Sequence, residues 1–195
     1  MRRIEVPKYI RGLIFDCDGT LVDSMPLHMT AWEHTIRSRN GKWEPEFFVA
    51  KKGMPEKKIV ELYNRRYGTA YDPAEPVEAK HAFFRARAAE LKPIPPVVEG
   101  VTRYRSVLPM AIASGGVREN VELELRVLGI EDCFKAIVTA DDGHVPPKPS
   151  PGIFLEAAGR IGVAPELCQV FEDGDLGLEA ARAAGMLPTD IRLYR

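Results

Sequence analysis

The stretch that decides the fold lies near the N-terminus. Residues 12–24 read Gly-Leu-Ile-Phe-Asp-Cys-Asp-Gly-Thr-Leu-Val-Asp-Ser. The apolar run Leu13–Phe15 is long enough for a buried strand and too short for a helix of its own. Because residues i and i+2 of an extended segment face the same side, Asp16 and Asp18 are expected to project together from the end of this strand. In parallel α/β sheets, ligands bind at that end.

The two acids predict a metal site. Carboxylates held side by side repel each other, and one of them would protonate unless a cation lay between them. Oxygen ligands of this kind suit Mg²⁺, which keeps several waters and commonly meets a phosphate. Asp16 and Asp18 therefore indicate Mg²⁺ as the cofactor.

A solvated turn and a calcium loop compete with the metal site as interpretations of these acids. Asp and Gly dominate turns, although a buried strand running straight into paired acids is unusual for a turn. A calcium loop requires Gly at its sixth position and Glu at its twelfth. Counted from Asp16, Gly19 is fourth and Leu27 is twelfth, which excludes the calcium loop.

The composition is that of an ordinary globular protein. The chain has 195 residues, of which 45% are hydrophobic and 28% charged, and its formal net charge is −1. This length allows one full core and a small extra domain. A charge near zero offers no electrostatic case for a nucleic acid or an anionic membrane as partner. No apolar run approaches the length of a membrane span, and the N-terminus lacks the apolar stretch of a signal peptide.

The cysteines indicate packing and not chemistry. Cys17, Cys133 and Cys168 are odd in number, widely spaced and in no metal-ligand pattern. They are typical of small core residues in a reducing compartment, so we expect a cytoplasmic protein. Cys17 lies between the two acids, but strand alternation points its side chain the other way.

Hydrophobic periodicity predicts a helical block followed by alternating strands and helices. Ser24 and Ser150 are the expected N-caps of two of the helices, and the prolines of residues 93–96 indicate a stiff linker. The expected strands are residues 10–16, 110–113, 136–139, 168–171 and 189–193. The expected helices are residues 25–39, 44–51, 59–67, 73–91, 97–107, 117–128, 150–161 and 176–184.

Strands that alternate with helices imply a parallel sheet covered by helices on both faces. The first strand belongs with the later ones, so the helical block is an insertion. We therefore predict an α/β fold with a Rossmann-like parallel-sheet core, residues 1–23 and 93–195, and an inserted helical cap domain, residues 24–92.

Polar groups follow three of the predicted strands, at ends that a parallel sheet places on one edge. Ser114 with Gly115 offers a hydroxyl and free N–H groups before a helix, which suits an anion. Lys148 stands between prolines that restrict the backbone around it. Glu172 and Asp173 follow the strand expected at residues 168–171. Each has a structural explanation when taken singly, as an N-cap, a loop lysine and acids at a helix N-terminus.

Taken together, these groups suit phosphoryl transfer, in which positioning and charge neutralisation dominate. Asp16 would attack phosphorus and form an aspartyl phosphate. Asp18 would protonate the leaving oxygen and later take a proton from water.

Four ordered motifs carry a resemblance to a known family. The stretches 16–20, Ser114, 148–149 and 172–177 are similar to the motifs of the haloacid dehalogenase-like hydrolase superfamily, and the helical insertion after Ser24 resembles its first type of cap. Residues 171–186 are similar to β-phosphoglucomutase-like and fructose-1-phosphatase-like members. The resemblance implies a fold of the haloacid dehalogenase type, Mg²⁺-dependent phosphatase activity, and a metal held by Asp16, the carbonyl of Asp18 and Asp173, with Glu172 close by.

The cap is expected to choose the substrate. By the same resemblance, His28 is a cap histidine that couples closure to Asp18, and Lys52, Gly53 and Met54 form a substrate-specificity loop. Mutases of the family carry an arginine shortly after that glycine, to hold a second phosphate, and Glu56 stands there in this chain. This difference favours water as the phosphoryl acceptor.

The sequence therefore predicts a Mg²⁺-dependent phosphatase of small sugar phosphates, acting as a monomer. β-Phosphoglucomutase is the first alternative. A non-catalytic module that binds a phosphorylated ligand is the second, although the presence of both Asp16 and Asp18 argues against it. A dehalogenase is less favoured, because that chemistry needs neither the metal site nor the second acid.

Overall fold

The structure is a computed structural model that describes residues 3–194. The chain divides into two compact units. The first, here called the sheet unit, is Met1–Asp23 with Lys92–Arg195, and the second, the helical unit, is Ser24–Leu91.

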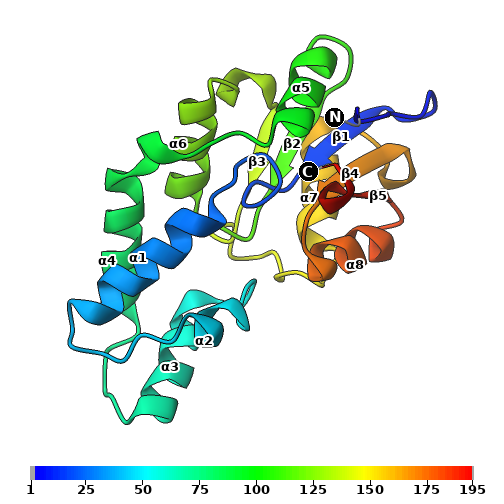
Figure 1. Cartoon of the computed structure of the whole chain (residues 1–195). Helices are drawn as coiled ribbons and strands as arrows, with labels where there is room; N and C mark the ends of the chain where they lie inside the picture. Colours follow the sequence, from blue (N-terminus) through cyan, green and yellow to red (C-terminus); the bar gives the residue numbers. More distant parts are fainter. Residues whose placement is uncertain (1–2, 195) are drawn as a thin grey trace. The chain divides into compact units, whose positions relative to one another are not determined.

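The sheet unit contains a parallel sheet of five strands (Figure 1). The strands are β1 (Gly12–Phe15), β2 (Met110–Ala113), β3 (Ala136–Val138), β4 (Cys168–Glu172) and β5 (Leu187–Asp190). Their order in the sheet is β3-β2-β1-β4-β5. β1 pairs with β2 and with β4, so that Phe15 lies beside Ile112 on one side and Phe171 on the other. The predicted α/β class with a Rossmann-like parallel sheet is confirmed.

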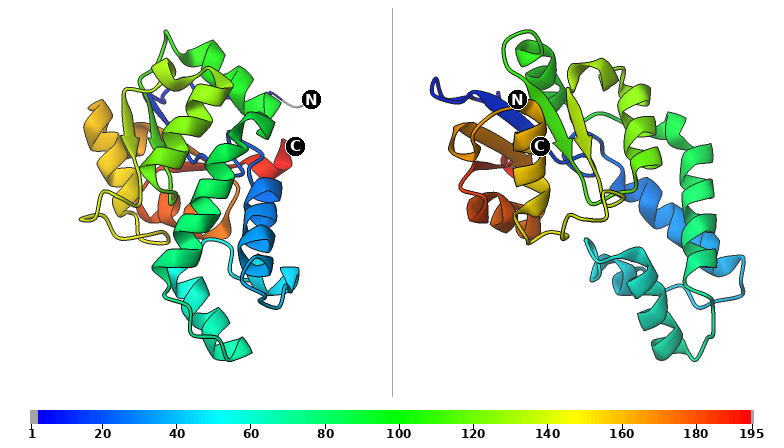
Figure 2. Two further views of the ribbon diagram at one scale, coloured as in Figure 1. Left: turned by 90° about the vertical axis from the view of Figure 1, so that its left-hand side faces the viewer. Right: turned by 180° about the vertical axis from the view of Figure 1, so that it is seen from behind.

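Helices cover both faces of this sheet, with α7 and α8 on one face and α5 and α6 on the other (Figure 2). Alternation along β1 divides its side chains between the two layers. Ile14 lies in the core cluster that α7 and α8 complete, whereas Phe15 stacks on Phe171 with ring centroids 4.7 Å apart. The four helices are α5 (Pro95–Tyr104), α6 (Arg118–Leu128), α7 (Gly152–Ile161) and α8 (Asp175–Ala183).

The predicted linker and the predicted last strand are both partly wrong. Helix α5 already begins at Pro95, because a proline in the first helical turn lacks only an N–H that would have no intrahelical acceptor. Ile94 before it is buried, which makes this segment part of the core. Strand β5 ends at Asp190, whose side chain accepts a hydrogen bond from the Arg192 N–H and starts the 3₁₀ turn Ile191–Leu193.

Of the two expected serine N-caps, Ser24 is confirmed in position and Ser150 is wrong. Ser24 stands at the N-cap position of α1 with helical backbone angles and no side-chain capping hydrogen bond. Helix α7 starts at Gly152 with Pro151 at the N-cap, while Ser150 Oγ lies before it and accepts from the Gly152 N–H at 3.4 Å. Short 3₁₀ turns complete the unit at Glu131–Cys133 and Pro165–Leu167.

Aromatic side chains form the core of the helical unit. Phe47 and Phe48 of α2 pack against Trp32 of α1 and Tyr63 of α3, and all four side chains are buried. Gly68, with φ of 68°, ends α3 in the left-handed conformation that glycine adopts without strain. The elements are α1 (Met25–Arg37), α2 (Pro45–Val49), α3 (Glu56–Tyr67), α4 (Ala74–Ala86) and the 3₁₀ turn Ala88–Glu90.

A buried ionic cluster joins α3 to α4. Lys80 and His81 are 1% and 6% exposed, and both contact the carboxylate of Glu56 at the start of α3. The Lys80 Nζ lies 2.7 Å from Glu56 Oε1. Burial alone would raise the pKa of Glu56, but the hydrogen bonds and charges of His81 and Lys80 outweigh it and lower this pKa to about 2.

We predict that Glu56→Gln lowers the free energy of unfolding by about 3 kcal/mol, because it leaves a buried lysine without its anion. The lowered pKa of Glu56 makes its contribution complete above the ordinary value of 4.5 and lost as the pH falls towards about 2. Denaturant titrations between pH 7 and pH 3 measure both effects. The matched control is Glu61→Gln, whose ion pair with Lys58 is exposed and should contribute less than about 1 kcal/mol. Equal losses for the two variants would contradict the prediction.

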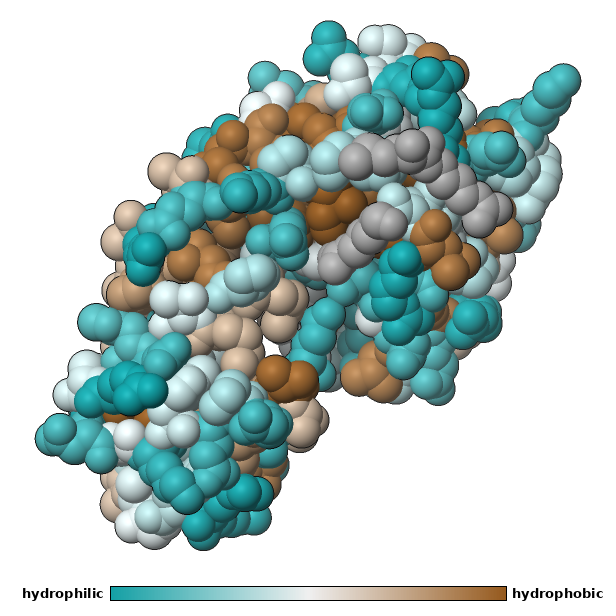
Figure 3. All heavy atoms as spheres, in the orientation of Figure 1, coloured by the Kyte–Doolittle hydropathy of each residue, from teal (hydrophilic) through white to brown (hydrophobic). Residues whose placement is uncertain are grey.

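Hydrophilic residues cover most of the face drawn in Figure 3. Large exposed apolar side chains such as Tyr9, Val49 and Val107 come from different elements of the chain. Among the residues described, no helix has the length and apolar character needed to cross a membrane.

Candidate active site

The carboxyl ends of the three central strands bring the predicted polar residues to one edge of the sheet. Asp16 follows β1, Ser114 follows β2, and Glu172 is the last residue of β4 with Asp173 after it. Because β1 lies between β2 and β4, these residues come from neighbouring strands. Backbone hydrogen bonds join the segments that follow neighbouring strands. The Asp16 N–H donates to Phe171 O at 3.0 Å, and the Ser114 N–H donates to Val138 O at 3.0 Å.

Lys148 reaches two of these acids from the loop that follows β3. Its Nζ lies 2.8 Å from Asp16 Oδ1 and 2.6 Å from Glu172 Oε2. The Lys148 side chain is 14% exposed, and the ring of Phe154 lies 5.0 Å from its Nζ. The Lys148–Pro149 peptide bond is cis.

The electrostatics of this cluster follow from burial. Burial raises the pKa of Asp16 to about 8, with the charge of Glu172 acting in the same direction and Lys148 opposing both. For Lys148, burial opposes the charged form, but the carboxylates of Asp16 and Glu172 outweigh it and raise the pKa of the ammonium group. Lys148 is therefore positively charged at neutral pH.

The acids fit a divalent cation. Carboxylate oxygens of Asp16, Glu172 and Asp173 all lie within 4.8 Å of one another, and all three residues are buried. Fully ionised, they carry three negative charges against the single positive charge of Lys148. A divalent cation would balance the remaining two negative charges. Mg²⁺ suits the site because it prefers carboxylate oxygens as ligands. Asp16 and Asp173 would hold such an ion, with Glu172 beside them.

Two glycines let the backbone approach these acids closely. A Cβ at Gly19, where φ is 79°, would overlap the carboxylate of Asp173, and a Cβ at Gly177 of α8 would overlap the carboxylate of Glu172. The N–H of Gly174 donates to Glu172 Oε1 at 2.9 Å, so backbone groups also orient this acid. Gly19 and Gly177 are not among the predicted site residues, although each lies within one of the acidic motifs.

We predict that Gly177→Ala lowers kcat/KM by roughly tenfold or more, because Glu172 must move and reacting groups misplaced by about 1 Å can lose two orders of magnitude in rate. Steady-state assays of phosphate release measure this loss. Gly159→Ala is the matched control, since Gly159 also lies inside a helix and no atom lies within 4 Å of a Cβ built on it. Activity of Gly177→Ala equal to that of Gly159→Ala would contradict the assigned close approach.

The side chains of Ser114 and Asp18 both lie close to Gly116. The Gly116 N–H donates to Ser114 Oγ at 3.0 Å. A Cβ at Gly116 would lie 3.2 Å from Asp18 Oδ2 and 3.3 Å from Ser114 Oγ, which places the acid and the hydroxyl around the same backbone. Gly115 is exposed, and no atom lies within 4 Å of a Cβ built on it. The Gly115 N–H precedes α6 (Arg118–Leu128) and can donate a hydrogen bond to an anion.

A buried acid that is absent from the predicted site, Glu124, lies near Asp18. Glu124 of α6 is fully buried, and Cys17 Sγ donates to its Oε2 at 2.9 Å. Burial raises the pKa of Glu124 well above its ordinary value, and the charges of Asp18 and Asp16 add to this effect. Cys17 lies outside β1 (Gly12–Phe15), so strand alternation does not decide where its side chain points. The contact between Cys17 and Glu124 could not be predicted from the sequence, since Glu124 belongs to none of the motifs.

The other residues predicted for the site belong to the helical unit. His28 lies in α1 and stacks on Phe84 of α4 with ring centroids 4.3 Å apart. Lys52, Gly53 and Met54 follow α2 as an exposed loop, in which Gly53 has φ of 82°. Their roles towards a substrate stay predictions.

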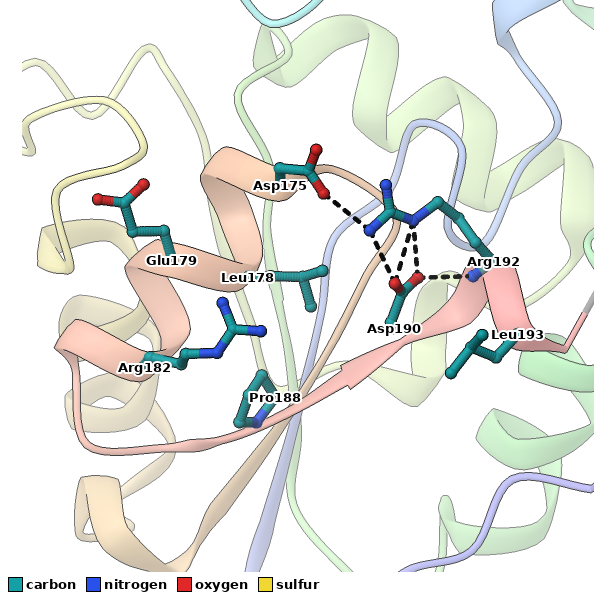
Figure 4. Close-up of a pocket in the computed structure, with 8 residues that line it drawn as sticks. All are labelled: Asp175, Leu178, Glu179, Arg182, Pro188, Asp190, Arg192 and Leu193. Atoms are coloured by element: carbon teal, nitrogen blue, oxygen red, sulfur yellow. Dashed lines mark hydrogen bonds and ion pairs between the residues drawn. The ribbon is translucent and has the colours of Figure 1, made fainter.

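A separate pocket of about 690 Å³ lies between α8 and β5 (Figure 4). Its charges are largely balanced, because Arg192 forms ion pairs of 2.7 Å with Asp190 and 2.8 Å with Asp175. None of the predicted site residues lines it. The lining residues are Asp175, Leu178, Glu179, Arg182, Pro188, Asp190, Arg192 and Leu193.

Comparisons with known proteins agree with this geometry. The chain is 36% identical over 183 residues to the fructose-1-phosphate phosphatase YqaB of Escherichia coli, a match that covers 93% of this chain and 96% of that protein. It is 29% identical over 192 residues to the beta-phosphoglucomutase of Bacillus subtilis, covering 93% and 83% of the two chains. The crystal structure of CbbY from Rhodobacter sphaeroides in complex with phosphate is similar, with a TM-score of 0.81 and 26% identity, over 92% of this chain and 84% of that one.

The family model that matches is that of the haloacid dehalogenase-like hydrolases, and the match extends over residues 10–185. This range includes strands β1 to β4, whose carboxyl ends and following loops supply the residues described above. The chain therefore belongs to the haloacid dehalogenase-like hydrolases.

Proposed function

We propose that this protein is a Mg²⁺-dependent phosphatase of small sugar phosphates, similar in activity to fructose-1-phosphate phosphatase. The observation that carries the proposal is the buried cluster of Asp16, Glu172 and Asp173 around Lys148, with bonds of 2.8 Å and 2.6 Å from its Nζ. The relative of that name, 36% identical over nearly the whole chain, supports the substrate class.

In the proposed reaction, Asp16 is the nucleophile. A carboxylate oxygen of Asp16 forms a bond to phosphorus while the bond from phosphorus to the sugar oxygen breaks, and Asp18 gives its proton to that oxygen. Asp18 then takes a proton from water as the water oxygen attacks phosphorus. The bond from phosphorus to Asp16 breaks, which releases phosphate and restores both acids.

Charge neutralisation is the task of the groups around this reaction. The ammonium group of Lys148 and the N–H groups after Ser114 stabilise the charge on the phosphoryl oxygens. Mg²⁺, when bound by Asp16, Asp173 and the carbonyl of Asp18, supplies the further positive charge that phosphoryl transfer needs.

Glu56 supports hydrolysis over a mutase reaction. A mutase must hold a second phosphate, for which a bidentate arginine is well suited. Here the corresponding position carries an acid, and its carboxylate is occupied by Lys80 and His81 of the same unit. Water is the acceptor that needs no second phosphate site.

A panel of hexose and pentose phosphates, assayed for phosphate release with and without Mg²⁺, tests the proposal. We expect release from monophosphates such as fructose 1-phosphate, and its loss without Mg²⁺. β-Phosphoglucomutase is the second candidate because a relative of that name is 29% identical to this chain. A coupled assay for conversion of β-glucose 1-phosphate to glucose 6-phosphate separates the two, and isomerisation faster than phosphate release would overturn the proposal.

A further inference from the structure

Lys148 lies far across the sheet from the strand that its loop follows. The loop that carries it leaves the sheet at the end of β3, which is an edge strand, and Lys148 contacts acids at the ends of β1 and β4. With neighbouring strands about 4.8 Å apart, these ends lie roughly 10 Å and 15 Å from β3 across the sheet. A loop of this span needs a fixed base if its lysine is to stay in place.

Asp142 provides contacts at that base. Its Oδ2 accepts from the Thr139 N–H at 2.8 Å and from the guanidinium of Arg118 at 2.8 Å. Its Oδ1 accepts from the guanidinium of Arg160 at 2.8 Å. One carboxylate thus joins the end of β3, the first residue of α6 and the last turn of α7.

The two arginines also form hydrogen bonds with β3, the strand that precedes the loop. Arg118 and Arg160 each donate to Ile137 O, at 3.2 Å and 3.1 Å. The Arg118 N–H also donates to Asp141 Oδ2 at 2.6 Å, and the Ala140 N–H donates to Gly116 O at 3.2 Å. The base of the loop is therefore tied to β3 and to the turn after Ser114.

Charge favours this arrangement. Burial alone would raise the pKa of Asp142, but the hydrogen bond from Arg160, the bond from the Thr139 N–H and the charges of both arginines lower it to about 2. The carboxylate therefore stays ionised at neutral pH, and hydrogen bonds to charged groups contribute more than neutral ones.

We propose that Asp142 is a positioning residue which, through Arg118 and Arg160, holds the base of residues 139–150 so that Lys148 reaches Asp16 and Glu172. The effect on turnover rests on the proposed role of Lys148. The clamp itself, defined as Asp142 with Arg118 and Arg160, rests only on the contacts described above.

A double-mutant cycle between Asp142→Ala and Lys148→Ala tests the proposal. We expect Asp142→Ala to lower kcat/KM by about 10- to 100-fold in the otherwise unchanged protein, as misplacement of a reacting group does. In the Lys148→Ala background the same change should cost less than about threefold, because the group it positions is gone. An equal loss in both backgrounds, or no loss in the first, would overturn the proposal.

Two further variants separate positioning from general stability. Asp142→Asn keeps an acceptor oxygen for the Thr139 N–H and should lose less activity than Asp142→Ala. If the alanine variant fails to fold, the asparagine variant takes its place in the test. Glu122→Gln is the matched control, since Glu122 lies on the same helix as Arg118 and its Oε1 is 3.6 Å from the Arg118 guanidinium. It should leave kcat/KM within about twofold, as surface substitutions usually do.

Hydrogen exchange gives a readout that does not depend on activity. In Asp142→Ala, the amides of residues 139–150 should exchange at least about tenfold faster, while those of β1 and β4 keep their protection. If the unaltered protein releases no phosphate from any substrate, the proposed function fails and this measurement alone decides the clamp. Unchanged exchange in residues 139–150 would overturn it.

Discussion

Asp16→Asn should lower kcat for phosphate release by at least about a thousandfold, because an amide oxygen is a poor nucleophile and loss of the nucleophile removes the covalent route. The fold should survive the change. Asn has the size of Asp, and Lys148 keeps Glu172 as its partner at 2.6 Å. Burial and the charge of Glu172 already disfavour the ionised form of Asp16 and raise its pKa to about 8, so a neutral group suits this position.

Single-turnover assays and denaturant titrations measure the two halves of this prediction. The matched control is Asp190→Asn, because Asp190 ends β5 at the same edge of the sheet and pairs with Arg192. It should keep kcat within about twofold, as expected of a substitution outside the reacting groups. If Asp16→Asn retained more than about one per cent of the activity, Asp16 would not be the nucleophile.

Removal of divalent cations with a chelator should abolish activity, and added Mg²⁺ should restore it. The reason is that Asp16, Glu172 and Asp173 would carry three negative charges once ionised, while Lys148, which contacts Asp16 and Glu172, supplies one positive charge. Binding should also be visible without turnover, since an ion at 100 times its dissociation constant stabilises the folded state by about 2.7 kcal/mol. Thermal unfolding with and without Mg²⁺ measures this shift.

Asp173→Ala should remove both the activation and the shift in melting temperature. Asp175→Ala is its matched control, because Asp175 is an exposed acid two residues further along that pairs with Arg192. The control should keep the shift in full. A shift of the same size in Asp173→Ala would mean that the ion binds elsewhere.

Much of the fold could be predicted because periodicity reports burial directly. The first four strands of the sheet are predicted to within two residues, since a short apolar run between polar turns is typical of a buried strand. The errors fall at the ends of elements. Pro95 is assigned to a linker although it opens α5, and the last strand is predicted to begin two residues late and to end three residues late, because local residue types leave element boundaries weakly determined.

The site divides in the same way. The positions of Asp16, Ser114 and Asp173 at one edge of the sheet could be predicted because each follows an apolar strand, and parallel strands bring their carboxyl ends to one edge. Glu124 and Asp142 could not, since nothing in their neighbourhood in the sequence marks them. Their importance comes from what lies opposite them in space.

By itself, the sequence determined the parallel sheet, the helical insertion and the edge at which the acids meet, because these depend on local patterns of apolar and polar residues. Only the tertiary structure decided which acids Lys148 pairs with, how Asp142 ties down the loop behind it, and that Glu56 is bound by Lys80 and His81. The contact of Lys148 with Asp16 joins residues 132 positions apart, and that of Asp142 with Arg160 joins residues 18 apart. The energies of such pairs depend on distance and burial in the folded chain, and neither is encoded in the neighbours of a residue along the sequence.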